Sequence, residues 1–196
     1  MSEDIYKLDR EIIRTEDKLR ILRREMFLSL VSAIDPNKPL EADSKLLGRL
    51  FNICRILSED DDSRAKYWMA MFYGGRFGPA IVGPDYRKAI WYLTGINGRI
   101  PIYKLGIEIC ERFGKKENAL SYALQGVVAS DVSDDIRLQL ARYFADNYIS
   151  GKSDVVIPDG VGEDFIEAFV GYVRNNREEL CLSDNDIKQM VVGLAA

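Results

Sequence analysis

Apolar residues recur at helical spacing along almost the whole chain. Between Glu3 and Val31 they form a heptad-like stripe that Thr15 interrupts. Its members are Ile5, Leu8, Ile12, Leu19, Leu22 and Met26. Residues three and four positions apart lie on one face of a helix, so this segment predicts one long amphipathic helix. Such a helix either packs along the rest of the chain or pairs with a copy of itself or a partner; because the stripe is short and broken, we favour packing within the chain.

Proline and capping residues divide the remaining sequence into shorter helices. Pro36 and Pro39 end the first helix, and a second is expected from Glu41 to Leu57. The acidic run before Ser63 favours the start of a third. The short run from Val155 to Ile157 is the one candidate strand in a pattern that is otherwise helical.

Three blocks of the central region share one pattern. They are AKYWMAMFY from Ala65, PIYKLGIEI from Pro101 and IRLQLARYF from Ile136, at spacings of 36 and 35 residues. The third position is large, the fifth aliphatic and the sixth small; the small residues are Ala70, Gly106 and Ala141. A period of this size is typical of stacked helical hairpins.

The segments between these blocks predict the second helix of each hairpin. DYRKAIWY and DFIEAFVGY each place an alanine four residues after aspartate, at Ala89 and Ala168, and Ala119 is the middle counterpart. A small residue lets a partner helix approach closely, while large neighbours fill the space beside it. We therefore expect the dense aromatic residues to be mostly core.

The first block, the following GG and DYRKAIWY resemble the Sel1-like repeat, a relative of the tetratricopeptide repeat, and YKLG from Tyr103 to Gly106 fits the same pattern. The resemblance covers residues 64–175 as three degenerate repeats. It implies an all-α, right-handed α-solenoid of about three hairpins. Residues 1–63 and 176–196 would add N- and C-terminal capping helices to one compact domain, because the ends of a repeat stack expose apolar surface.

Composition narrows the chemistry. The chain has 196 residues, 47% of them hydrophobic, a net charge of −4 and no histidine, so the usual neutral-pH acid–base group and the commonest metal ligand are missing. The three cysteines, Cys54, Cys110 and Cys181, form no CxxC pair. We expect no enzyme activity, no metal and no cofactor. With no signal-like or membrane-spanning segment, a cytoplasmic location is expected.

Charge is unevenly distributed. Residues 64–116 hold ten Lys or Arg and three Asp or Glu, a net of +7, whereas residues 117–196 have a net of −8. The basic segment favours a partner with an acidic surface. It also leaves an alternative, a nucleic-acid-binding helical-repeat protein that uses residues 64–116, although the overall acidity makes nucleic acid an unlikely partner.

The family resemblance implies a non-catalytic adaptor, chaperone or scaffold that binds another protein in a concave groove; a secretion chaperone or a toxin-immunity protein would be specific forms of this function. First helices line such a groove, so its candidate residues are Arg64, Tyr67, Met71, Tyr103, Ile107, Leu138 and Arg142. Arg76 and Phe77, at the tip of the glycine-rich loop after the first block, are candidates for a further partner contact. For each of these residues the competing interpretation is ordinary packing.

Overall fold

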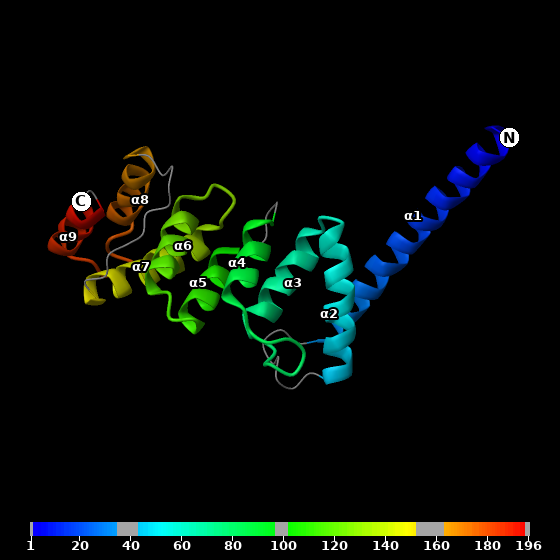
Figure 1. Cartoon of the computed structure of the whole chain (residues 1–196). Helices are drawn as coiled ribbons and strands as arrows, with labels where there is room; N and C mark the ends of the chain where they lie inside the picture. Colours follow the sequence, from blue (N-terminus) through cyan, green and yellow to red (C-terminus); the bar gives the residue numbers. More distant parts are fainter. Residues whose placement is uncertain (1, 35–42, 97–101, 152–162, 195–196) are drawn as a thin grey trace. The chain divides into compact units, whose positions relative to one another are not determined.

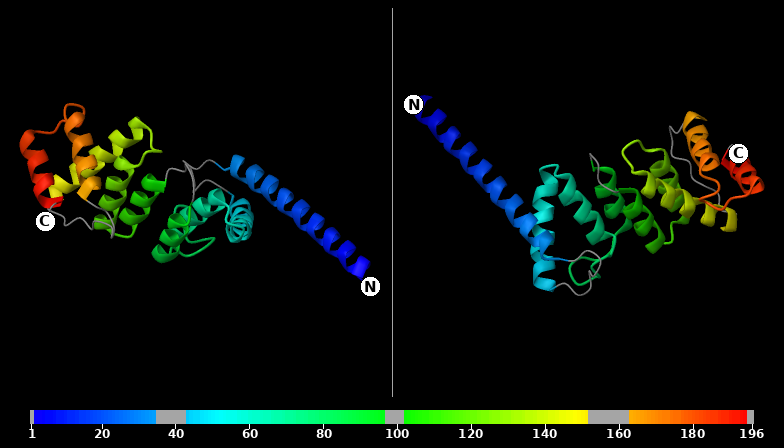
Figure 2. Two further views of the ribbon diagram at one scale, coloured as in Figure 1. Left: turned by 90° about the horizontal axis from the view of Figure 1, so that it is seen from above. Right: turned by 180° about the vertical axis from the view of Figure 1, so that it is seen from behind.

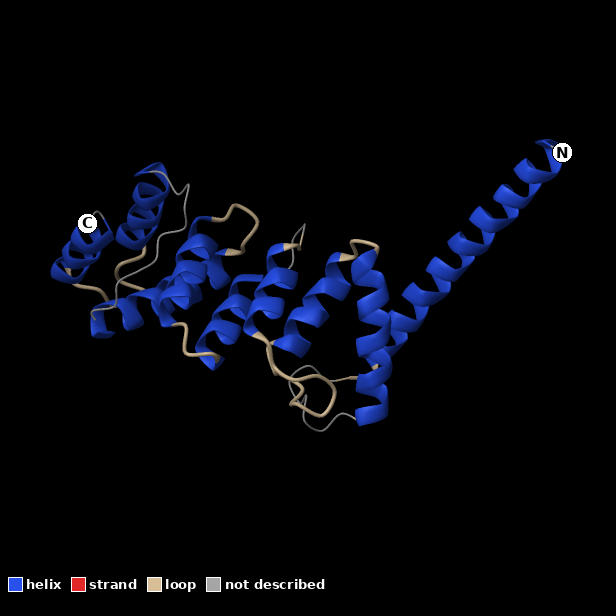
Figure 3. Ribbon diagram, in the orientation of Figure 1, coloured by secondary structure: helices blue, strands red, loops and turns tan. Residues whose placement is uncertain are grey.

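All regular secondary structure that the structure describes is helical. The computed structural model describes residues 2–34, 43–96, 102–151 and 163–194. Within these ranges no residue belongs to a strand (Figure 3). The predicted all-α class is therefore confirmed for the described residues. Pro36, Pro39 and the candidate strand at residues 155–157 lie outside them.

The described residues form nine helices, which follow the predicted order. They are α1 (Ser2–Ser32), α2 (Ser44–Glu59), α3 (Ser63–Tyr73), α4 (Tyr86–Thr94), α5 (Ile102–Arg112), α6 (Lys116–Val128), α7 (Asp134–Gly151), α8 (Glu163–Asn175) and α9 (Asp184–Leu194). The three repeat blocks correspond to α3, α5 and α7, and the expected second helices to α4, α6 and α8.

The helices are arranged in two compact units, Met1–Ile96 and Asn97–Ala196. In the first unit each helix packs on the next, from α1 to α4 (Figure 1). In the second unit α5 packs on α6 and α6 on α7, while α8 lies against α6 and α9, and α9 also contacts α7. The boundary between the units falls within the segment that the repeat pattern covers.

Only the last turns of α1 pack on the rest of its unit. Phe27, Leu30 and Ile34 are buried, and Arg24 Nη2 lies 3.3 Å from Asp62 Oδ2. The N-terminal part of α1 extends beyond α2, as both views of Figure 2 show. The expected packing of this helix within the chain is thus confined to its C-terminal end.

The turn that joins α2 to α3 combines a helix cap with a buried cation. The N-cap of α3 is Asp62, whose Oδ1 accepts hydrogen bonds from the backbone N–H groups of Arg64 and Ala65, at 3.0 and 3.1 Å. Lys66 is buried; its Nζ pairs with Asp61 and donates to the Gly95 carbonyl at 2.7 Å. Because a buried cation is costly without partners, these contacts hold the end of α4 against the α2–α3 turn.

The small residues predicted in the first helices are buried. Ala70 and Ala141 have no exposed surface, and Gly106 is buried on α5. At Gly106 a Cβ atom would lie 2.7 Å from the ring of Tyr122 on α6. Real Cβ atoms do not approach so closely, so the glycine is what lets this ring lie against the α5 backbone.

The predicted register of the second helices is right for two of the three. Ala89 and Ala119 are fully buried, but Ala168 is exposed. In α8 the next residue, Phe169, faces the core and meets Phe144 of α7 edge to face, with ring centroids 4.8 Å apart. These two rings, and no small residue, join α8 to α7, while α8 otherwise lies against α6 and α9. The alanine pattern was therefore misleading there.

Replacement of Gly106 by leucine tests this packing. We expect Gly106→Leu to lower the free energy of unfolding by about 1–3 kcal/mol, because the new side chain must displace Tyr122. The matched control is Gly171→Leu in α8, where a Cβ meets nothing within 4 Å. Chemical denaturation should show a loss of stability for the first variant only; equal stabilities would contradict the assigned contact.

Candidate partner-binding surface

The glycine-rich loop after α3 folds back onto its own helix. Gly75 and Gly78 have positive φ values of 79° and 73°, which turn the chain sharply. Phe77 between them is buried, stacked on Trp68 with ring centroids 5.6 Å apart and tilted against Phe72 at 4.6 Å. The expectation that Phe77 lies at an exposed tip and contacts a partner is wrong: its ring closes the core of the first unit.

Arg76, beside it, is half-buried, and its Nη1 lies 3.3 Å from the sulfur of Met71. Met71 on α3 and Ile107 on α5 are themselves buried. Their positions in the repeat pattern placed them on the face turned away from the second helix, but the packing of each unit covers that face. For Met71 and Ile107 the competing interpretation, ordinary packing, describes the structure.

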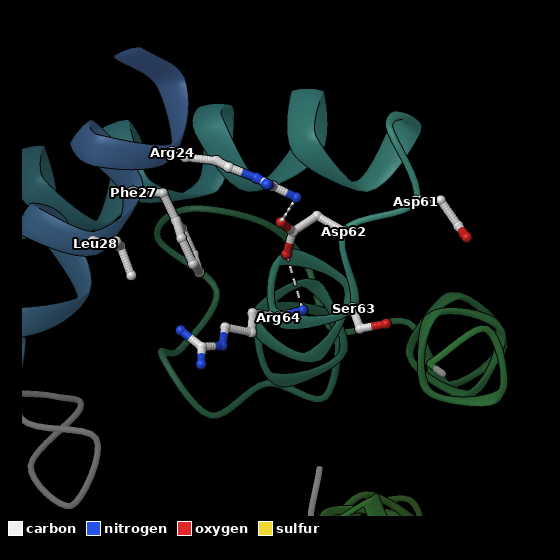
Figure 4. Close-up of a pocket in the computed structure, with 7 residues that line it drawn as sticks. All are labelled: Arg24, Phe27, Leu28, Asp61, Asp62, Ser63 and Arg64. Atoms are coloured by element: carbon white, nitrogen blue, oxygen red, sulfur yellow. Dashed lines mark hydrogen bonds and ion pairs between the residues drawn. The ribbon is translucent and has the colours of Figure 1, made fainter. Parts of the chain in front are cut away.

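Arg64 lies at the edge of an open cleft between α1 and α3. The cleft has a volume of about 410 Å³ and is lined by Arg24, Phe27, Leu28, Asp61, Asp62, Ser63 and Arg64. Figure 4 shows Asp62 joined both to the Arg24 guanidinium and to the start of α3, with the Arg64 side chain extending to the Phe27 side. Tyr67, one turn further along α3, is half-buried. The cleft therefore combines an apolar wall with an exposed arginine.

In the second unit the candidate residues have intramolecular contacts of their own. Tyr103 and Leu138 are half-buried, and a Cβ at Gly126 of α6 would meet the side chains of Tyr103 and Leu140. Arg142 is exposed, with its Nη2 donating to the Glu179 carbonyl at 2.7 Å. Tyr103 thus supports the packing of α5 on α6, whereas Arg142 joins α7 to the segment between α8 and α9. All three residues keep some accessible surface.

The most exposed aromatic residue in the described chain was not among the candidates. Trp91 on α4 has 67% of its surface exposed. Its ring meets Tyr92 edge to face at 4.8 Å, Tyr92 stacks on Tyr73 at 5.8 Å, and Lys88 Nζ lies 5.1 Å from the Tyr73 ring centroid. We refer to Tyr73, Lys88, Trp91 and Tyr92 as the aromatic surface. It belongs entirely to the first unit, and its rings support one another.

The helical period of α4 indicates that Trp91 is exposed. Ala89 and Leu93 are the buried residues of α4, and at 100° per residue position 91 lies on the opposite side of the helix. The sequence predicts that the dense aromatic residues are mostly core, and it does not single out Trp91 as the ring of DYRKAIWY that faces outward. Exposed Arg87, on the same helix, adds a positive charge beside the aromatic surface.

Among the described residues, burial raises the pKa of several ionisable groups. Burial raises the pKa of the Cys54 thiol, and the charge of Asp62 raises it further, so the thiol stays protonated. Burial also raises the pKa of Tyr143, and its 2.9 Å hydrogen bond to Glu111 adds to the shift. Within the described ranges no three Cys, Asp or Glu side chains converge to hold a metal ion.

Comparison with known proteins found no relative: no family model, curated protein or solved structure matches the chain. The resemblance to the Sel1-like repeat therefore stays a prediction. Among the described helices, none is long and apolar enough to cross a membrane.

Two aromatic substitutions should separate core from surface. Phe77→Ala removes a buried ring and should lower the free energy of unfolding by about 3–5 kcal/mol. Trp91→Ala removes an exposed ring and should change it by no more than about 0.5 kcal/mol. Thermal or urea denaturation of both variants gives the comparison. A wild-type stability for Phe77→Ala would show that the loop does not close the core.

Proposed function

We propose that this protein is a non-catalytic protein-binding module, and that the aromatic surface of the first unit is its main contact. The observation that carries this proposal is the exposed Trp91, held on Tyr92 and Tyr73. Tryptophan and tyrosine are enriched at protein interfaces, and a few such residues supply most of the binding energy. A ring already fixed by its neighbours loses little freedom when a partner covers it.

Charge indicates which partner fits. Arg87 and Lys88 are exposed on the same helix as Trp91, within a segment of net charge +7. An acidic protein surface would be attracted to these side chains, and the attraction would speed association more than it tightens the complex. We propose an adaptor, chaperone or scaffold role, with the helical hairpins assembled as a Sel1-like or tetratricopeptide-like solenoid.

Single-stranded nucleic acid is the second candidate ligand. Exposed aromatic rings beside basic side chains can stack bases and neutralise phosphates, and the aromatic surface with Arg87 offers both groups. The net charge of −4 argues against it. The two candidates differ in salt dependence, because affinity for nucleic acid falls steeply as salt rises.

The test compares Trp91→Ala with a matched control. Asn52→Ala changes an exposed residue of α2 and should keep the wild-type interaction. Affinity capture of the native protein with mass spectrometry identifies the bound protein, and titration with that purified protein then measures the affinity. We expect Trp91→Ala to weaken binding by at least about tenfold, which corresponds to about 1.4 kcal/mol, within the usual range for such residues.

Equal affinities for Trp91→Ala and Asn52→Ala would contradict the aromatic surface as the contact. Tight binding of an oligonucleotide at physiological salt, lost in Trp91→Ala, would instead support the nucleic-acid alternative.

A further inference from the structure

Between Leu19 and Met26, helix α1 carries an uncovered apolar face. Leu19, Leu22 and Met26 have 45%, 59% and 44% of their surface exposed. With Leu30 they stand at positions i, i+3, i+7 and i+11, which place them on one face of a helix. Leu30 is buried, in the turns that pack on the rest of the unit. The apolar face is therefore continuous with the interface inside the unit and runs out past it.

The spacing of this face is that of a coiled coil. Thr15 and Leu22 occupy d positions, and Leu19 and Met26 occupy a positions, of one heptad register. Charged residues occupy the flanking positions: Glu16 and Arg23 at e, and Lys18 and Glu25 at g. Charges at e and g positions select the partner and the orientation of a coiled coil, so these residues indicate what the face can bind.

A parallel pair of α1 helices would place like charges together. In a parallel pair each g residue faces the e residue five positions further along the other chain. Glu11 would then face Glu16 of the second copy, and Lys18 would face Arg23. Both contacts are repulsive, so the sequence of α1 disfavours this orientation.

An antiparallel pair centred between Arg20 and Ile21 places opposite charges together. Leu19 of each copy then lies opposite Leu22 of the other, and Met26 opposite Thr15. In an antiparallel pair the e residues of one helix lie beside the e residues of the other, and the g residues beside the g residues. Glu16 therefore meets Arg23 of the second copy and Lys18 meets Glu25, each twice by symmetry. All four flanking contacts are attractive in this register. Sliding one helix along the other by one heptad in either direction brings like charges together, Glu16 with Glu16 or Arg23 with Arg23.

We propose that α1 joins two copies of this chain through an antiparallel helix pair in which Leu19 and Leu22 form the core. This contact buries the uncovered apolar face of α1 and extends the interface that Leu30 makes inside the unit. It also pairs the charged residues at the e and g positions with residues of opposite charge. It is a second interaction surface, separate from the aromatic surface, and leaves that surface free for another partner.

Disulfide trapping tests the proposal directly. The variants Thr15→Cys and Met26→Cys are made in a Cys181→Ser background, because Cys181 is exposed whereas Cys54 and Cys110 are buried. In the proposed register residue 15 of one copy lies opposite residue 26 of the other. Two copies of either position alone are eleven residues apart, about 16 Å at 1.5 Å per residue. A disulfide needs Cα atoms within about 7 Å. We expect a cross-linked dimer only when the two variants are mixed.

Charge reversal gives an independent readout by sedimentation. Lys18→Glu should dissociate the dimer, because the change sets like charges side by side, and Lys18→Glu combined with Glu25→Lys should restore it. The control Arg14→Glu changes an exposed residue away from the apolar face and should have no effect. Restoration by the double variant cannot arise from simple damage to the first unit.

Three results would overturn the proposal: a monomer at all concentrations of the full chain, cross-linking of Thr15→Cys by itself, or no rescue by the double variant. The second of these would mean a parallel pair.

Discussion

Tyrosine rings lying against glycine backbone hold the second unit together. Tyr122 of α6 meets Gly106 of α5, Tyr103 of α5 meets Gly126 of α6, and Tyr148 of α7 meets Gly193 of α9. Glycine inside a helix costs about 1 kcal/mol relative to alanine. Helices α5 and α6 bear that cost because Gly106 and Gly126 each admit a large ring close to the backbone, where it buries apolar area that alanine would exclude. The positions of α5, α6, α7 and α9 depend on these contacts.

The first unit relies on rings packed against rings. Phe77 returns from the loop to stack on Trp68 and Phe72, and Lys66 fixes the end of α4 through Gly95. With Ala89 and Leu93 turned inward, the same helix must turn Trp91 outward. The exposure of the proposed contact residue thus follows from how α4 is anchored. The uncovered face of α1 has a similar origin, because α1 has 31 residues and α2 only 16.

The sequence predicted most of the helices and the inward residues of the first helices, because periodicity and small residues report local geometry directly. The sequence-based prediction failed where contacts between helices and loops decide which residues are buried. Ala168 fits the alanine pattern but is exposed, since Phe144 and Phe169 already fill that contact. The neighbours of Phe77 in the sequence are those of a loop tip. Its side chain is nevertheless in the core, because Gly75 and Gly78 turn the chain back. Trp91 could have been recognised as exposed by applying the helical period within α4.

Tryptophan fluorescence tests most directly the claim that the packing of α4 presents Trp91 to a partner. The chain has two tryptophans, Trp68 buried and Trp91 exposed. In Trp68→Phe the remaining Trp91 should emit at long wavelength and be strongly quenched by iodide. In Trp91→Phe the remaining Trp68 should emit at shorter wavelength and be protected. Equal quenching of the two variants, or a protected Trp91 in the free protein, would contradict this account of the surface.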